Sequence, residues 1–207
     1  PALSKFSKES KEKLQKAWDS ELEIMIALAL PLVVGGIVLG QKIIYSFYPA
    51  DFAPAALAFQ ILIGAAGIIF LYRPFYDVMI VLNQQRKTFW ITMAGAVGNV
   101  LLNLILIPKY SLYGAAAATV ITQFLVLCSI IFFTKKFTFI QFPVLRIFLT
   151  FLISAFSASA MYFVIKQLLA HNLSIFLLVF AGAAIYFFPF VILRKYILTA
   201  YCKQIYA

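Results

Sequence analysis

Two side chains of opposite charge lie four residues apart in an apolar stretch of the chain, Arg73 and Asp77 in the segment LYRPFYD. Residues at this spacing share one face of a helix and can pair there. A guanidinium presents a fork of donors that fits phosphate oxygens, so Arg73 could face a water-filled cavity and contact a phosphate, with Asp77 tuning it or carrying a coupling proton. The alternative is a mutually neutralising pair that only helps to hold helices together. Counted by helix rise, Arg73 lies about 15 Å before Asn83, so we expect the pair well inside a membrane-spanning helix.

Asn99 and Asn103 repeat the four-residue spacing in another apolar stretch. Amide side chains within a membrane are costly unless they find partners, so two of them on one face predict a helix packed inside a bundle. Thr119, Thr122 and Gln123 in the following stretch would extend this polar stripe. Such a stripe suits contact with a polar substrate, and it also suits hydrogen bonding between neighbouring helices.

Lys42, near the far end of the first apolar stretch, completes the set of candidate substrate-binding residues. Its long stem could carry the ammonium group to the membrane interface. If it instead faces inward, it could draw an anionic headgroup outward after Arg73.

Signatures of catalysis are missing from the sequence. It contains no HExxH, no GxSxG and no Walker-type glycine loop. After residue 23 the acidic residues are Asp51 and Asp77, which leaves no carboxylate pair for sugar chemistry. Cys128 and Cys202 stand apart from one another, without the spacing of a metal or redox site. We therefore expect no enzyme, no metal and no cofactor.

Composition identifies the class of protein. Hydrophobic residues make up 64% of the 207 residues, charged residues make up 12%, and the mean hydropathy is +0.99. A soluble domain of this size needs far more charge, so we expect an all-α, polytopic membrane protein. Six apolar runs are long enough to span a bilayer, at about 24–47, 55–82, 88–107, 114–134, 144–166 and 174–193.

The basic residues set the expected orientation. Thirteen of the 17 Lys and Arg flank the runs on one side, which the positive-inside rule places in the cytoplasm together with both termini. Topology therefore explains the net charge of +10, and nucleic acid is not expected as a partner.

The segment before the first run has a different character. Phe6, Leu14, Trp18 and Leu22 fall on one helical face among lysines, which suits a helix on the cytoplasmic membrane surface with Trp18 as its anchor. A solvated lead-in to the first span is the plainer alternative. The expected division of the chain is a cytoplasmic linker with an interfacial amphipathic helix at 1–23, a six-helix transmembrane bundle at 24–193 and a cytoplasmic tail at 194–207.

Residues 98–121, GNVLLNLILIPKYSLYGAAAATVI, resemble the "N…N…LIP-x-x-G-x-x-GAA-x-AT" stretch of bacterial polysaccharide flippases of the O-antigen and capsule type. The opening PALS and the ALPLVVGG around Pro31 resemble other parts of that family, which belongs to the multidrug, oligosaccharidyl-lipid and polysaccharide exporter superfamily. Ser111 departs from the pattern, because the family usually has glycine there. The resemblance implies the second half of a twelve-helix transporter, with a first six-helix half missing from this chain.

The resemblance also implies a function. Its cargo would be an undecaprenyl-pyrophosphate-linked oligosaccharide, moved from the cytoplasmic to the periplasmic leaflet of the bacterial inner membrane for surface polysaccharide biosynthesis. Arg73 is the first choice for pyrophosphate contact and Lys42 the second, with membrane lipids as further partners. Lipid II flippases and multidrug exporters share the architecture and stay as alternatives. So do a non-transporting subunit or fragment, and a membrane enzyme of the same pathway, although such an enzyme predicts a large outer loop that this sequence lacks.

Overall fold

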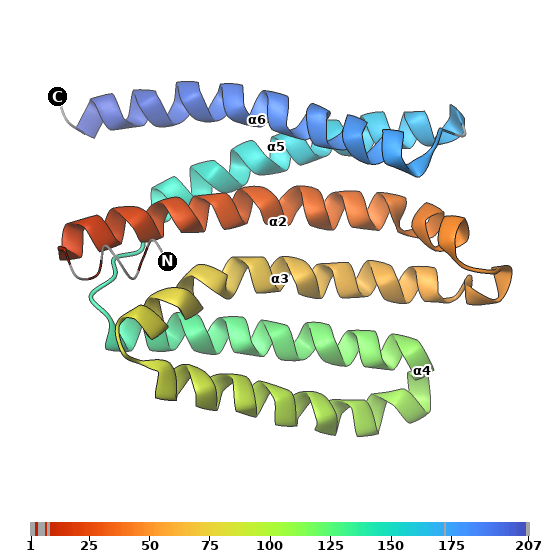
Figure 1. The fold of residues 1–207 in the computed structure, drawn as a ribbon, viewed down its shortest axis with the longest axis horizontal. Coiled ribbons are helices and arrows are strands. Elements are labelled where there is room, and N and C mark those ends of the chain that lie inside the picture. The colour runs from red at the N-terminus through yellow and green to blue at the C-terminus, as the bar shows by residue number, and fades with distance from the viewer. Residues whose placement is uncertain (1–2, 4–6, 8, 172, 206–207) are drawn as a thin grey trace.

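A computed structural model describes residues 3, 7, 9–171 and 173–205. Its main elements are α2 (Lys11–Phe47), α3 (Ala55–Val81), α4 (Gln85–Phe137), α5 (Val144–Leu168) and α6 (Ile175–Ile205), with short 3-10 turns η1 (Ala50–Phe52) and η2 (Leu169–His171). No strand occurs in these residues. All five long helices are apolar enough to cross a membrane (Figure 1), so the all-α polytopic membrane fold predicted from composition is confirmed.

Helix α4 contains two of the six predicted spans. Its backbone leaves the helical conformation at Ser111, where φ is 50° and ψ is −130°, and the second part returns beside the first as an α4 hairpin (Figure 1). The turn is tight, because a Cβ at Gly114 would lie 2.3 Å from the carbonyl oxygen of Leu106. Positive φ is strained for a serine and free for glycine, which explains physically why the resembling family has glycine at this position.

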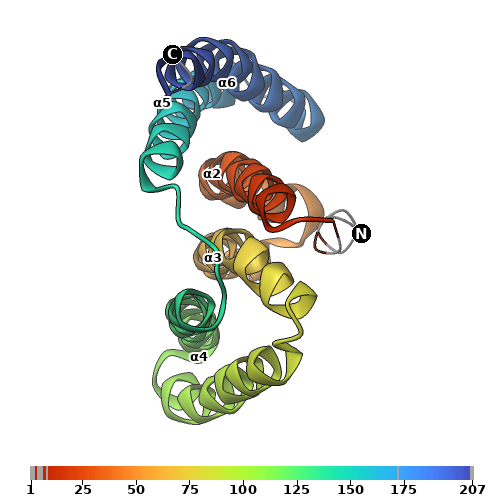
Figure 2. The ribbon, with the colours of Figure 1, turned by 90° about the vertical axis from the view of Figure 1, so that its left-hand side faces the viewer.

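Helix α2 lies at the centre of the molecule. It packs against α3 on one side and against α5 and α6 on the other, and α3 in turn packs against the α4 hairpin. Viewed end-on, the helices form a curved array with α2 between the α5–α6 pair and α3 (Figure 2). Two apolar cores result, one around Val78 and Met79 of α3 and one around Met161 and Leu178 of α5 and α6.

Helix α2 begins well before the first apolar run. Ser10 caps its N-terminus by accepting a hydrogen bond from the Lys13 backbone N–H at 3.1 Å, and the helix continues unbroken past residue 23. The amphipathic segment and the first span are therefore one helix. Phe6, the first residue of the predicted apolar face, lies outside the described residues.

The rest of that apolar face packs against protein. Leu14, Trp18 and Leu22 are all buried, and the Trp18 ring meets Phe142 edge-on at 5.8 Å between centroids. The Trp18 indole N–H donates to the Pro74 carbonyl oxygen at 3.1 Å. The prediction that Trp18 anchors the helix in the membrane interface is thus wrong, because α3 and the α4–α5 connection supply the apolar and polar partners that the interface was expected to supply.

Candidate functional site

Arg73 and Asp77 form the predicted pair on α3. Arg73 Nε donates to Asp77 Oδ2 at 2.8 Å. The Arg73 side chain is 57% exposed and that of Asp77 is 26% exposed, so the guanidinium is open to a ligand. Exposure of this kind favours a contact residue over a sealed structural pair, which would be expected to be buried.

The pair lies beside the N-terminal part of α2. The Trp18–Pro74 hydrogen bond places this turn of α3 beside the part of α2 that precedes the apolar run 24–47. The sequence count had placed Arg73 well inside the second span. That depth stays a prediction; Arg73 lies within α3, and because α2 begins at Lys11, the first turns of α2 run alongside the last turns of α3.

Glu21 of α2 is a third member of this ionic group, and sequence reasoning did not single it out. Its half-buried carboxyl group lies close to the carboxyl group of Asp77 and within electrostatic range of Arg73. Burial, followed by the negative charge of Asp77, raises the pKa of Glu21 to about 7. The Glu21 carboxyl therefore holds a proton more tightly than an exposed glutamate does. The missed signal was that Glu21 lies one helical turn beyond Trp18, on the segment treated as a linker.

Asn99 joins the two parts of the α4 hairpin, and Asn103 is hydrogen-bonded to it from the next turn of the same helix. Asn103 Nδ2 donates to Asn99 Oδ1 at 2.9 Å, and Asn99 Nδ2 donates to Thr122 Oγ1 at 3.2 Å. Of the predicted polar stripe, the Asn99–Thr122 hydrogen bond links the two parts of the hairpin, whereas Thr119 Oγ1 donates to the Ala115 carbonyl oxygen of its own helix. Among the described residues, the buried oxygens Asn103 Oδ1 and Gln123 Oε1 accept no hydrogen bond.

A polar cavity of about 360 Å³ lies between α3 and the α4 hairpin. Its lining comprises Tyr72, Thr92, Gly95, Ala96, Asn99, Thr119, Thr122, Gln123 and Val126. A buried amide oxygen without a donor is costly, so the cavity suits water or a ligand rich in hydroxyl groups. Tyr72, which precedes Arg73 in the chain, lines the cavity, whereas Arg73, Asp77 and Asn103 do not.

Lys42 is far from the other candidates. It is half-exposed near the C-terminal end of α2, about 31 Å of helix rise from Glu21. The structure therefore does not bring Lys42 to Arg73, and a joint contact with one phosphate group is excluded by distance in this arrangement.

A second ionic group fastens α2 to α5 and α6. Glu23 is buried, and its Oε2 accepts a hydrogen bond from Arg194 Nη2 at 2.8 Å. Arg146 Nε forms an ion pair with Glu23 Oε1, and Arg146 Nη1 lies 3.7 Å from Asp19 Oδ2. Burial raises the pKa of Asp19, against the smaller effects of its hydrogen bond and of Arg146. The sequence placed all four residues on one side of the membrane, but it counted both arginines only as topology signals.

In the part of the chain that the structure describes, no group of three His, Cys, Asp or Glu side chains could hold a metal ion. The polar groups in this region that could contact a ligand include the guanidinium of Arg73 and the amides and hydroxyls of the cavity.

The chain was compared with known protein families, sequences and structures, and only its fold has a match. No family model and no curated protein sequence matches the chain. Among solved structures it is similar to a lipid II flippase, MurJ, in an inward closed conformation, with a TM-score of 0.75 and 18% sequence identity over 97% of this chain. The chain spans 42% of the length of that protein. The likeness shows that the chain has the fold of one part of a flippase-like membrane protein.

Proposed function

We propose that this chain is one half of a membrane transporter that flips a lipid-linked oligosaccharide from the cytoplasmic to the periplasmic leaflet for surface polysaccharide biosynthesis. The observation that carries the proposal is the exposed Arg73 on α3, the helix whose Tyr72 lines a polar cavity, in a fold similar to that of a flippase. The cargo inferred from the sequence resemblance is an undecaprenyl-pyrophosphate-linked oligosaccharide, in the bacterial inner membrane with both termini cytoplasmic.

Arg73 is suited to the pyrophosphate because part of its donor set is free. Asp77 takes the Nε–H, and no described residue accepts a hydrogen bond from the two terminal nitrogens of the guanidinium. These nitrogens can therefore bind phosphate oxygens while the pair persists. When Glu21 is protonated, the group loses one negative charge, which strengthens its attraction for a phosphate.

The sugar portion would enter the polar cavity. Gln123 contributes an amide group and Tyr72 an aromatic ring to the same lining. The hydroxyl groups of a sugar can hydrogen-bond to amide and hydroxyl side chains, and the C–H face of a sugar ring can stack on the aromatic ring. Asn99 keeps the α4 hairpin in register at this point, so it shapes the cavity as well as lining it.

A complete transport cycle requires more than this chain. The structural neighbour is more than twice as long, so we infer a further six-helix half, with the cargo passing between the halves as they rock. Lys42 would then meet the headgroup late, near the outer surface, after it has left Arg73.

The test is the variant Arg73→Ala in the full-length protein, with surface polysaccharide measured at equal expression. We expect a strong loss of display, with partial activity in Arg73→Lys because the charge stays and the fork of donors is lost. Arg86→Ala, an exposed arginine on α4, is the matched control and should display normally. Normal display in Arg73→Ala would remove Arg73 from the site.

A lipid II flippase is the second candidate, because the similar structure carries that name. Expression of the full-length protein in cells depleted of their own lipid II flippase separates the two functions. Restored growth would favour lipid II as cargo, whereas restored surface polysaccharide in a polysaccharide-flippase mutant, without restored growth of the depleted cells, would favour the first proposal.

A further inference from the structure

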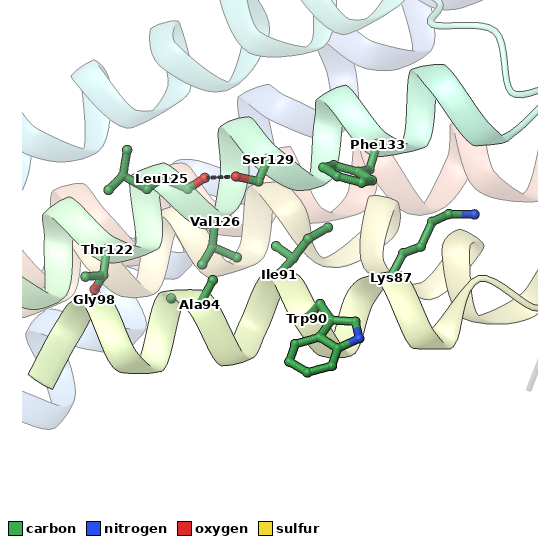
Figure 3. Close-up of a pocket in the computed structure, with 11 residues that line it drawn as sticks. Lys87, Trp90, Ile91, Ala94, Gly98, Thr122, Leu125, Val126, Ser129 and Phe133 are labelled. Atoms are coloured by element: carbon green, nitrogen blue, oxygen red, sulfur yellow. Dashed lines mark hydrogen bonds between the residues drawn. The ribbon is translucent and has the colours of Figure 1, made fainter.

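An apolar groove runs along the α4 hairpin (Figure 3). It has a volume of about 560 Å³ and shares Gly95, Thr122 and Val126 with the polar cavity, but its remaining lining is different. The two depressions therefore lie on opposite sides of the contact between the two parts of the hairpin. Ile91, Val126 and the ring of Phe133 contribute to its apolar surface.

The hydroxyl groups in the groove already donate hydrogen bonds to their own helix. Ser129 Oγ donates to the Leu125 carbonyl oxygen at 2.8 Å, as the dashed line in Figure 3 shows. Thr122 Oγ1 donates to the Ala118 carbonyl oxygen at 2.9 Å. Because these groups are satisfied by their own helix, the groove presents a surface for hydrocarbon, unlike the polar cavity with its unpaired Gln123 oxygen.

One end of the groove is basic. Lys87 is the charged residue in its lining, and its Nζ lies 3.8 Å from the centre of the Phe137 ring. Its Nζ also donates a hydrogen bond to Gln84 Oε1, but no acidic residue in the described chain forms a salt bridge with Lys87, so its charge is not neutralised. Lys135 and Lys136 lie in the last turn of the neighbouring part of the hairpin, at the same end. Basic pockets between helices at the cytoplasmic surface favour anionic lipid headgroups.

The dimensions of the groove match one leaflet of a bilayer. From Lys87 to Gly98 the helix rises about 16 Å, close to half of the hydrocarbon thickness of a membrane. Trp90, 59% exposed at the basic end, has the position expected of an interfacial aromatic residue.

The geometry points to a binding site for an anionic membrane phospholipid, with one acyl chain in the groove of the α4 hairpin and its phosphate on Lys87. An anionic phospholipid fits this site because its phosphate can pair with the basic end and its acyl chain matches the apolar wall, which is about one leaflet long. The site does not depend on the proposed transport function, because any phospholipid of the leaflet on the Lys87 side can reach it.

The experiment is native mass spectrometry of the full chain purified from membranes, with added phosphatidylglycerol or phosphatidylcholine of the same acyl chains. We expect preferential retention of phosphatidylglycerol, and a loss of about fivefold in that preference in Lys87→Met. Lys109→Met, at the opposite end of the hairpin, is the matched control and should keep the preference. An unchanged preference in Lys87→Met would overturn the proposal.

Variants that fill the groove test the acyl chain. Ala94→Phe and Gly98→Leu each place bulk in the groove, and both should reduce retention of the two lipids several-fold. Leu104→Phe adds bulk to an exposed position outside the groove and should behave as the wild type. Retention unaffected in both groove variants would overturn the site even if one of them folded poorly.

Competition distinguishes the other occupants. If undecaprenyl phosphate displaces phosphatidylglycerol at equal concentration, the groove holds the lipid tail of a transport substrate and the phospholipid site is refuted. If the wild type retains neither lipid, the groove is covered by protein, and the proposal fails as well.

Discussion

Neutralising the buried carboxylate of Glu23 should loosen the joint between α2 and the α5–α6 pair. The variant Glu23→Gln keeps nearly the same volume and leaves one carbonyl oxygen to accept from Arg194. It removes the negative charge that Arg146 and Arg194 share, so the two guanidiniums then face each other across the amide. The fold should persist, but with a reduced free energy of unfolding.

The magnitude follows from the burial of the three side chains. Breaking a fully buried ion pair costs about 3–5 kcal/mol, and a charged hydrogen bond contributes about 1.5–3 kcal/mol. The side chain of Glu23 is 4% exposed, but those of Arg146 and Arg194 are 29% and 41% exposed, so both arginines can recover hydration. We therefore expect a loss of about 2 kcal/mol, which corresponds to about a thirtyfold change in the unfolding equilibrium constant.

The assay is unfolding by sodium dodecyl sulfate in mixed micelles, followed by tryptophan fluorescence. In a Trp90→Phe background Trp18 is the remaining tryptophan, and its buried position makes it a reporter of the fold. Glu12→Gln, an exposed glutamate in the first turn of α2, is the control and should change the free energy by less than about 0.5 kcal/mol. A double-mutant cycle with Arg194→Gln should give a coupling energy above about 1 kcal/mol. If Glu23→Gln is as stable as Glu12→Gln, the reasoning about this joint is refuted.

Three further predictions use the same assay. Ser111→Gly should stabilise the chain by about 1 kcal/mol because it relieves positive φ, and no gain would argue against the turn geometry at that residue. Gly114→Ala should destabilise the chain by about 1–3 kcal/mol, because the new Cβ meets the backbone of Leu106. The control Gly64→Ala has open space around its new Cβ and should be neutral or slightly stabilising. Equal changes in stability for the two variants would contradict the close approach at Gly114. The free energy of unfolding should fall as pH rises between about 4.5 and 7, because the folded state holds the proton of Glu21 more tightly than the unfolded state does. Glu21→Gln should flatten this pH dependence. An unchanged pH profile in Glu21→Gln would exclude Glu21 as its source.

The membrane-spanning helices could be predicted from the sequence, because each apolar run is long enough to span a bilayer and is flanked by charged residues. It also predicted a break between the runs at about 88–107 and 114–134, where Ser111 leaves the helical conformation, and it predicted that Arg73 and Asp77 can pair. The hydrogen bond between Asn99 and Thr122 followed from the cost of leaving an intramembrane amide unpaired.

The parts that were missed depend on how helices lie beside one another. Local sequence does not give the length by which α2 extends past its apolar run, and that extension places Trp18 against Pro74 and Glu21 against Asp77. The same limit applies to Glu23, whose two arginine partners are more than 120 residues away in the chain. An apolar face can pack on a membrane or on another helix, and composition does not distinguish the two.

The water-filled route itself is tested most directly by thiol labelling. In a chain with both native cysteines replaced, Ala96→Cys and Gln123→Cys place thiols in the polar cavity, and Leu104→Cys places one on the apolar exterior. We predict that a membrane-impermeant, water-soluble thiol reagent modifies the two cavity positions in intact membranes or inverted vesicles and leaves position 104 unmodified. Modification at position 104 with none at 96 and 123 would contradict a polar cavity open to water and, with it, the proposed path of the headgroup.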